Sequence, residues 1–141
     1  MATWQEFERQ APELAKAVRH RFDRDKHKLL ATVRKDGAPR ITGIETVFED
    51  GQLRVGSMAD SWKSRDLKRD PRFALHSTSS DQTMTDGDAR ISGTMALHSS
   101  SDDADTFTAD ITEAVTITVE GNELVIVSWH EGKGVSRAVR T

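Results

Sequence analysis

Cationic side chains crowd into one short stretch, SWKSRDLKRDPR (residues 61–72), although the formal net charge of the whole chain is −3. The stretch carries two Asp residues and five cations, which are Lys63, Arg65, Lys68, Arg69 and Arg72. Such a density of Lys and Arg is typical of a site for an anionic group, or of a helix face that contacts only water. The choice between these interpretations depends on the local structure that carries the charges.

The residues around the cations predict a short helix. Ser61 is a typical N-cap, and the residue before a proline avoids the helical region, so Asp70-Pro71 would end the helix. Lys63 and Arg65 then fall in its first turns, where the helix dipole disfavours each exposed cation by about 0.3–1 kcal/mol. A bound anion would reverse the sign of that interaction.

A phosphate fits this arrangement. Free backbone N–H groups at the helix start can hold it together with the hydroxyls of Ser57 and Ser61 and the ammonium of Lys63. Arg40, on a preceding predicted strand, can supply a second cation. We therefore predict a phosphate-binding turn at residues 61–65, and a solvated basic helix face is the alternative.

Composition restricts the class of protein. A chain of 141 residues has the size of one domain, so we expect a single domain over residues 1–141. It contains no cysteine, which excludes disulfides and thiolate chemistry. With 30% charged residues and a pI near 5.9, it lacks the basic character of nucleic-acid-binding domains. It shows neither a signal peptide nor an apolar run of about 18 residues, so we expect no membrane segment and a cytoplasmic location.

The segments before the basic stretch predict helix and then strands. Thr3 and Glu6 form a capping box at the start of a helical apolar pattern, which Pro12 divides into a short helix and a longer one. Short β-rich runs separated by turns follow from residue 28. Two of the turns are Asp-Gly pairs typical of hairpins, at residues 36–37 and 50–51. The strands expected here span residues 28–34, 40–49 and 53–57.

Four more strands are predicted after the basic helix. They span residues 72–78, 88–98, 111–120 and 123–129, and a short helix over 101–107 is expected between the second and the third of them. About seven antiparallel strands, an N-terminal helix and a short helix after the third strand indicate a mainly β protein. A split β-barrel is favoured because closure removes sheet edges, and a two-sheet sandwich is the alternative.

Other reactive constellations are incomplete. The five histidines include no pair at i,i+4 spacing, so we expect no metal site. The chain has no Gly-rich dinucleotide loop, no Walker loop and no Gly-x-Ser-x-Gly turn, so nucleotide hydrolysis and serine hydrolysis are not supported. No catalytic residue is assigned, which suits an enzyme whose cofactor carries the reaction.

Five segments, in their order and spacing, resemble the pyridoxamine 5'-phosphate oxidase-like superfamily of FMN-binding split β-barrels, and within it the actinobacterial flavin/deazaflavin oxidoreductases. The segments are LLATVRKDGAPRITG (29–43), LRVGSM (53–58), SWKSRDLKRDPRFALHS (61–77), ISGTMALH (91–98) and VIVSWHEGKG (125–134). The resemblance covers nearly the whole chain and implies the split-barrel fold.

The resemblance also implies a set of cofactor-binding residues. The phosphate ligands would be Lys63, Arg40 and Ser61, and Trp62 occupies a position where many relatives place Arg or Lys. The residues lining the ring system would be Ile41, Thr42, Gly56, Ser57 and Met58. Trp129 belongs to the C-terminal segment that borders the cofactor in the resembled family.

The function implied by the resemblance is that of a flavin-dependent oxidoreductase, with FMN as cofactor and an unidentified small molecule as substrate. Two alternatives stay open. One is a reductase that uses the deazaflavin coenzyme F420, whose anionic tail would need Arg65, Lys68 and Arg69. The other is a non-catalytic protein that stores or senses a flavin or haem.

A homodimer is expected for two reasons. Met58, Trp62 and Trp129 would expose apolar surface beside a polar site, and the resembled family binds its cofactor across a two-fold interface. Residues 130–141 are then either an arm that crosses to the partner and borders its cofactor, or a frayed basic terminus.

Overall fold

The computed structural model describes residues 2–79 and 81–141, which contain three helices and eight strands. The helices are α1 (Trp4–Gln10), α2 (Pro12–Arg24) and α3 (Trp62–Arg69). The strands are β1 (His27–Val33), β2 (Pro39–Glu49), β3 (Gln52–Met58), β4 (Arg72–His76), β5 (Asp88–Ser100), β6 (Ala104–Glu120), β7 (Glu123–His130) and β8 (Gly134–Arg140).

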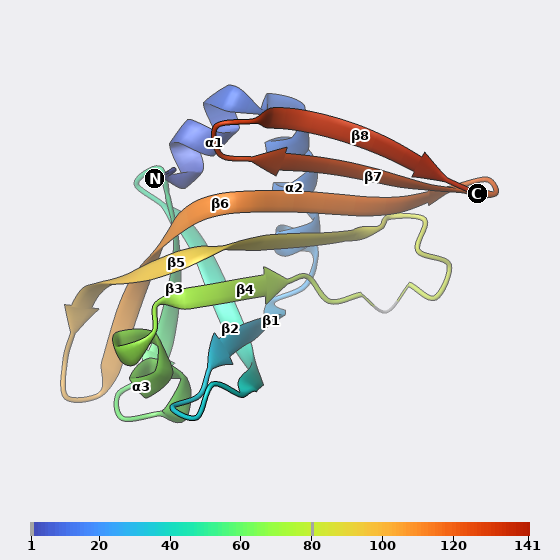
Figure 1. Ribbon diagram of the computed structural model, residues 1–141. Helices are drawn as coiled ribbons and strands as arrows, with labels where there is room; N and C mark the ends of the chain where they lie inside the picture. The colour runs from blue at the N-terminus through green and yellow to red at the C-terminus, as the bar shows by residue number, and fades with distance from the viewer. Residues whose placement is uncertain (1, 80) are drawn as a thin grey trace.

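Six strands close into an antiparallel barrel (Figure 1). They are paired in the order β3-β2-β1-β4-β5-β6, and β6 pairs back onto β3 from Arg54↔Thr108 to Met58↔Ala104. The predicted barrel is confirmed, and the sandwich is not formed. Both predicted Asp-Gly turns are present; in the second, Asp50 and Gly51 have φ of 54° and 72°, a left-handed pair that suits a tight hairpin.

β7 and β8 extend the sheet beyond the barrel (Figure 1). β8 pairs with β7 from Leu124↔Arg140 to His130↔Gly134, so residues 134–140 form a strand on their own chain and the terminus is not frayed. The prediction of seven strands was one short. Gly132, with φ of 80°, allows the tight turn in which Lys133 N donates to His130 O at 2.9 Å.

The start of β6 also corrects the sequence analysis, because the helix expected over residues 101–107 does not form. Ser101 N donates to Ala104 O in a turn, and Ala104 already begins the strand. Asp105 and Phe107 are both buried, and the residues on either side of them are more exposed. This two-residue alternation is typical of a strand. The acidic composition of this segment concealed that period.

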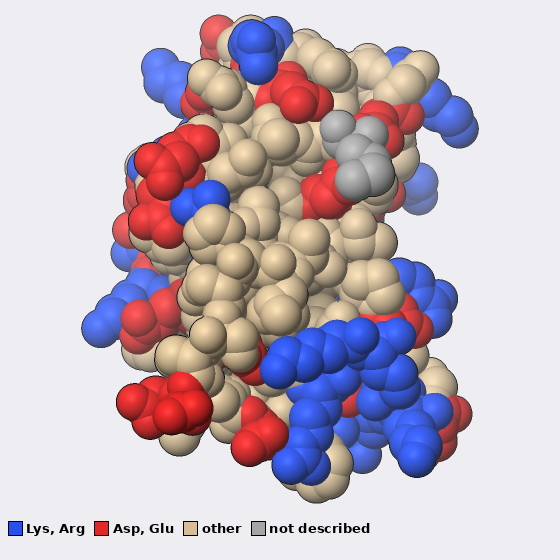
Figure 2. Space-filling view, turned by 90° about the vertical axis from the view of Figure 1, so that its left-hand side faces the viewer, with Lys and Arg blue, Asp and Glu red and all other residues tan. Residues whose placement is uncertain are grey.

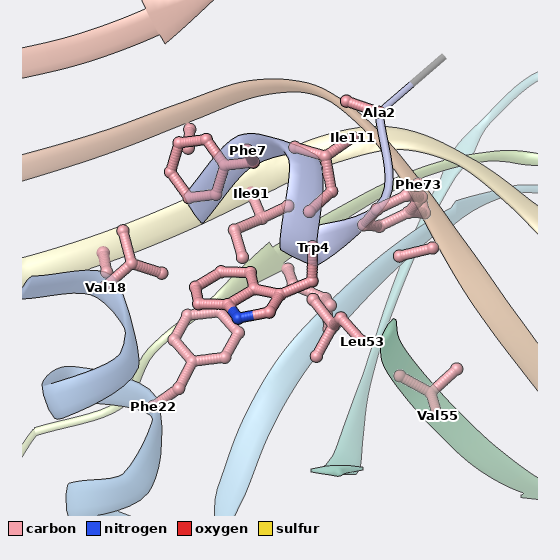
Figure 3. Packing of buried hydrophobic residues seen from close by; sticks show 14 of the residues in the cluster. Ala2, Trp4, Phe7, Val18, Phe22, Leu53, Val55, Phe73, Ile91 and Ile111 are labelled. Atoms are coloured by element: carbon pink, nitrogen blue, oxygen red, sulfur yellow. The ribbon is translucent and has the colours of Figure 1, made fainter. Parts of the chain in front are cut away.

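The core lies between the barrel wall and the two N-terminal helices (Figure 3). Thr3 caps α1 by accepting a hydrogen bond from Glu6 N at 3.1 Å, and Pro12 begins α2, so the predicted division of the helix is confirmed. The Trp4 ring packs edge-on against Phe7 and Phe48, with centroids 5.3 and 4.6 Å apart. None of the helices in the described part of the chain is long and apolar enough to cross a bilayer.

Trp129 belongs to this core. Its side chain is fully buried, and its ring centroid lies 5.0 Å from that of Phe7. The expectation that Trp129 adds exposed apolar surface is therefore wrong. Trp62, in contrast, is 63% exposed.

This contrast gives a matched prediction. Trp129→Ala should lower the free energy of unfolding by about 3–5 kcal/mol, because it removes a large buried side chain and leaves a cavity. Trp62→Ala should change it by less than about 0.5 kcal/mol, because Trp62 contacts mainly solvent. Urea denaturation of both variants measures the difference, and equal destabilisation would contradict the placement of Trp129 in the core.

Candidate cofactor site

The N-terminus of α3 lies beside the end of β3, as the sequence predicts. Ser61 is the N-cap, and its Oγ accepts a hydrogen bond from Ser64 N at 3.3 Å. The helix runs to Arg69 and ends at Asp70, directly before Pro71. The basic stretch therefore forms a helix whose first turn can face a ligand.

Three serine hydroxyls form a chain at this helix start. Ser64 Oγ donates to Ser57 Oγ at 3.0 Å, and Ser57 Oγ lies 2.7 Å from Ser61 Oγ. When Ser57 donates to Ser61, the hydroxyl hydrogen of Ser61 stays available to an anion. The Lys63 ammonium donates to the Gly43 carbonyl at 2.9 Å, and two of its three hydrogens stay available as well.

A cavity of about 370 Å³ opens at this point. Its lining residues are His27, Gly43, Ile44, Glu45, Gly56, Ser57, Met58, Ser61 and Lys63. They come from β1, β2, β3 and the start of α3, so the cavity lies where the helix meets the outer side of the barrel. Five of the ten predicted site residues are brought together here, namely Gly56, Ser57, Met58, Ser61 and Lys63.

Two glycines keep the floor of the cavity flat. A Cβ added to Gly43 or Gly56 would meet no other atom within 4 Å. Neither residue has positive φ among the described glycines, so the backbone does not require glycine at these positions. Glycine weakens a strand interior and commonly marks a place where a ligand approaches the backbone closely. The open space above Gly43 and Gly56 is thus a cradle that a side chain would fill.

The remaining predicted residues lie outside the cavity lining. Ile41 is on the outer side of β2 and 69% exposed, whereas Arg40 and Thr42 alternate with it and are half-buried. Thr42 Oγ1 is buried without a hydrogen-bond partner in the described chain. Trp62 is exposed next to the cavity residue Lys63. Trp129 is buried against Phe7, and the structure does not bring it to the cavity.

Arg40 is held by a buried carboxylate. Its Nε donates to Asp66 Oδ2 at 2.7 Å, and its guanidinium lies 5.5 Å from the centroid of the Trp62 ring. Asp66 is only 1% exposed and also accepts hydrogen bonds from Thr32 Oγ1 at 2.8 Å and Arg69 Nη2 at 3.2 Å. Burial raises the pKa of Asp66, but the hydrogen bonds from Arg40, Thr32 and Arg69 outweigh it, so the pKa lies below its ordinary value.

The other cations of the stretch are also largely paired. Lys68 Nζ lies 3.0 Å from Asp105 Oδ2, where the Ser100 hydroxyl and the Lys68 ammonium hold the pKa of Asp105 below its usual range. Arg72 binds Asp70 through Nε and Nη2 and lowers the pKa of that carboxyl to about 2.

Within the described residues, Arg65 has no ion pair, and its guanidinium lies 5.1 Å from the Trp62 ring centroid. Figure 2 shows the resulting broad patch of Lys and Arg at its lower right.

The sequence analysis missed four residues of the cavity, His27, Gly43, Ile44 and Glu45. Gly43 and Glu45 share the outer side of β2 with Ile41, and the alternation of that strand was a usable signal for both. His27 joins them because it pairs with Glu45 across β1 and β2. That register depends on the fold and could not be read from His27 alone.

Comparison with known proteins agrees with this fold. A family model described as pyridoxamine 5'-phosphate oxidase matches residues 14–131. Among curated proteins no significant match was found. The chain therefore belongs, by its family match, to the pyridoxamine 5'-phosphate oxidase family.

Solved structures share the fold at low sequence identity. PhzG from Burkholderia lata 383, in complex with tetrahydrophenazine-1-carboxylic acid, has a TM-score of 0.71 at 12% identity, covering 92% of this chain and 89% of that chain. A pyridoxamine 5'-phosphate oxidase-related, FMN binding protein from Nostoc punctiforme has a TM-score of 0.68 at 15% identity. The match covers 100% of this chain and 98% of that chain. An F420 reductase has a TM-score of 0.52 at 18% identity. The match covers 62% of this chain and 87% of that chain.

The buried Asp66 carboxylate yields a prediction about stability and pH. Asp66→Asn should lower the free energy of unfolding at pH 7 by about 3 kcal/mol, because it leaves the Arg40 guanidinium without its charged partner. The folded-state pKa of Asp66 is depressed, so its contribution is complete above the unfolded pKa of about 3.9 and is lost as pH falls through the folded pKa. The difference between variant and wild type should therefore be constant down to about pH 4 and shrink below it.

Urea denaturation at a series of pH values measures this difference. Asp102→Asn, at an exposed turn position, is the control and should have little effect at any pH. A difference that grows as the pH falls below 4 would contradict the assignment.

Proposed function

We propose that this protein is a flavin-dependent oxidoreductase that binds FMN in the cavity at the start of α3 and acts on a small substrate. The phosphate would be held by Lys63 and Ser61 at the helix N-terminus, where the dipole and free N–H groups favour an anion. The ring system would lie over the floor formed by Gly43 and Gly56. Family membership and the similarity of fold to an FMN binding protein support this proposal.

The observation that carries the proposal is the pair of glycines in strand interiors. A planar ring can approach the strand backbone closely only where no side chain projects, and both positions open onto the same cavity as Lys63. Gly43 also accepts the Lys63 hydrogen bond through its carbonyl, so the floor and the cation are joined directly. The residues present therefore fit a ligand with a phosphate and a flat ring.

In this proposal the flavin supplies the hydride chemistry, and the chain supplies binding and orientation. Lys63 neutralises phosphate charge, and the serine chain adds a hydroxyl donor beside it. Asp66 keeps Arg40 beside Trp62 and ties α3 to β1 and β2, which fixes the helix start relative to the cavity. Met58, 76% exposed at the cavity edge, gives an apolar surface against which a ring can pack.

Coenzyme F420 is the second candidate, because Arg65, Lys68 and Arg69 follow Lys63 along α3 and would receive an anionic tail. Figure 2 shows that Lys and Arg form a broad patch on this face of the molecule. Two of the three cations considered for that tail are already paired, Lys68 with Asp105 and Arg69 with Asp66. Of these three cations, Arg65 alone has no ion pair among the described residues, and it lies against the Trp62 ring. This pairing favours FMN over F420. A storage or sensing role for the bound flavin or haem would differ from both in showing no turnover.

Fluorescence titration with FMN and with F420 tests the proposal through two variants. Gly43→Val should reduce FMN affinity by at least about 30-fold, because the new side chain fills the floor, while stability is unchanged or rises by up to about 1 kcal/mol in the strand. Lys63→Ala should reduce affinity about tenfold through loss of a charge-assisted bond and leave stability almost unchanged. If FMN binds both variants as tightly as it binds wild type, the cavity is not the flavin site.

We also propose that a second copy of the chain covers the outer side of β1, β2 and β3. Large apolar side chains are exposed there beside the cavity, and they are Leu29 at 42%, Ile41 at 69%, Val47 at 46% and Met58 at 76%. A cofactor and a partner molecule would together bury this surface. The proposed homodimer thus completes the site from the open side.

Sedimentation should accordingly give twice the chain mass of 15.7 kDa at micromolar concentration. Ile41→Glu should shift the protein toward the monomer, because it buries a charge in the proposed interface. Leu97→Glu, which changes an apolar residue of β5 that is 50% exposed, is the matched control and should stay dimeric. A wild-type monomer, or equal effects of the two variants, would refute the proposed interface.

A further inference from the structure

The cavity has an anionic end that phosphate binding does not use. Glu45 lines the same cavity as Lys63 and lies two residues along β2 from Gly43, whose carbonyl binds the Lys63 ammonium. Two residues of a strand span about 7 Å. The Lys63 ammonium of α3 therefore meets β2 at Gly43, and Glu45 follows two residues farther along the same side of that strand.

The Glu45 carboxylate has acceptor capacity to spare. Lys26 Nζ and His27 Nε2 lie 3.5 and 3.6 Å away, and both approach the same oxygen, Oε1. No hydrogen bond to Glu45 and no ion pair to its Oε2 is present in the described chain. Glu49, farther along β2, differs because Arg54 Nη1 donates to it at 3.2 Å. Glu45 is thus the carboxylate of this strand that is left open at a cavity.

The floor of the cavity gives a ligand access to this carboxylate. Thr46 pairs with Val55, so the antiparallel register sets Gly56 beside Glu45 on the outer side of the sheet. His27 pairs with Glu45 from the other side. Because a Cβ on Gly56 would meet nothing within 4 Å, the approach over Gly56 is clear. A ligand bound at Lys63 and lying over the glycines would reach Glu45.

A carboxylate in the same cavity opposes the binding of a bare anion through Coulomb repulsion. It strengthens binding only when the ligand also offers a hydrogen-bond donor, since an ionised acceptor forms the stronger class of hydrogen bond. The cavity therefore distinguishes a phosphate that carries a donor group from a phosphate that does not.

We propose that Glu45 is a specificity-determining residue that accepts a hydrogen bond from a hydroxyl or N–H group of a ligand whose phosphate is held at Lys63. The ligand class is a phosphomonoester that carries a hydroxyl or N–H donor beyond its phosphate, such as a polyol phosphate or a phosphorylated amine. The inference rests on the phosphate site of the proposed function and does not depend on a flavin ring.

The test compares ribitol 5-phosphate with inorganic phosphate by calorimetry on the intact protein. Wild type should bind the polyol phosphate about tenfold more tightly than inorganic phosphate. Glu45→Ala should reduce this preference to about twofold or less and bind inorganic phosphate two- to threefold more tightly, because the repulsion is gone. Glu45→Gln, which keeps a neutral acceptor, should restore part of the preference.

Two controls separate local from general effects. Glu123→Gln removes one negative charge at an exposed position of β7 and should leave the preference unchanged. Lys63→Ala should weaken both ligands by a similar factor. A wild type that binds ribitol 5-phosphate no better than inorganic phosphate, or not at all, overturns the proposal, and so does a preference that survives in Glu45→Ala.

The flavin assignment fails or stands independently of this result. If neither FMN nor F420 binds wild type but the preference depends on Glu45, the proposed oxidoreductase function fails and the specificity role holds. If FMN binds through Lys63 and the preference is the same in Glu45→Ala, the role of Glu45 is refuted and the flavin site holds.

Discussion

The buried carboxylate of Asp66 joins the three elements on which the candidate site depends. It lies on α3 and accepts hydrogen bonds from Thr32 on β1 and Arg40 on β2, so it ties the helix to the barrel wall from inside. A second ion pair, between Lys68 and the fully buried Asp105, ties the same helix to β6. With the helix held at both places, Ser61 and Lys63 have a defined position against the end of β3. Each of these buried carboxylates must keep its cationic partner, because a buried charge without a partner lowers the free energy of unfolding.

The pleat of the sheet explains how one short wall serves both the core and a cavity. Inward-facing Ile44, Leu53 and Val55 are buried, and the outward-facing residues between them include Gly43 and Gly56. Alternation therefore places the packed side chains on one side of the strands and the two open glycines on the other. The same rule separates two neighbours on β2, because Ile41 faces outward while Thr42 lies on the other side of the strand.

The positive charges of residues 61–72 divide into two groups with different physical roles. Lys68, Arg69 and Arg72 form ion pairs with Asp105, Asp66 and Asp70, and they explain much of the local density of cations as structural. Lys63 binds only a backbone carbonyl among the described residues, at the edge of the cavity. A basic cluster in a sequence thus combines cations that form ion pairs with cations that do not. The positions of acidic residues, including the distant Asp105, decide which cations are left unpaired.

Local sequence determined the parts of this protein that depend on neighbouring residues. The Thr3 cap, the break at Pro12, the Asp-Gly hairpins and the helix between Ser61 and Asp70 were all predictable, because each depends on contacts within a few residues. The barrel followed from the order of these elements and from family resemblance.

Tertiary structure alone decided what depends on distant pairing. The closure of β6 on β3 turned the acidic segment after Ser101 into a strand, and the pairing of β8 on β7 ordered the C-terminal residues. Packing against Phe7 buried Trp129, and the register of β1 on β2 placed His27 beside Glu45. A single sequence does not display these contacts, because their free energy comes from residues brought together only when the barrel closes.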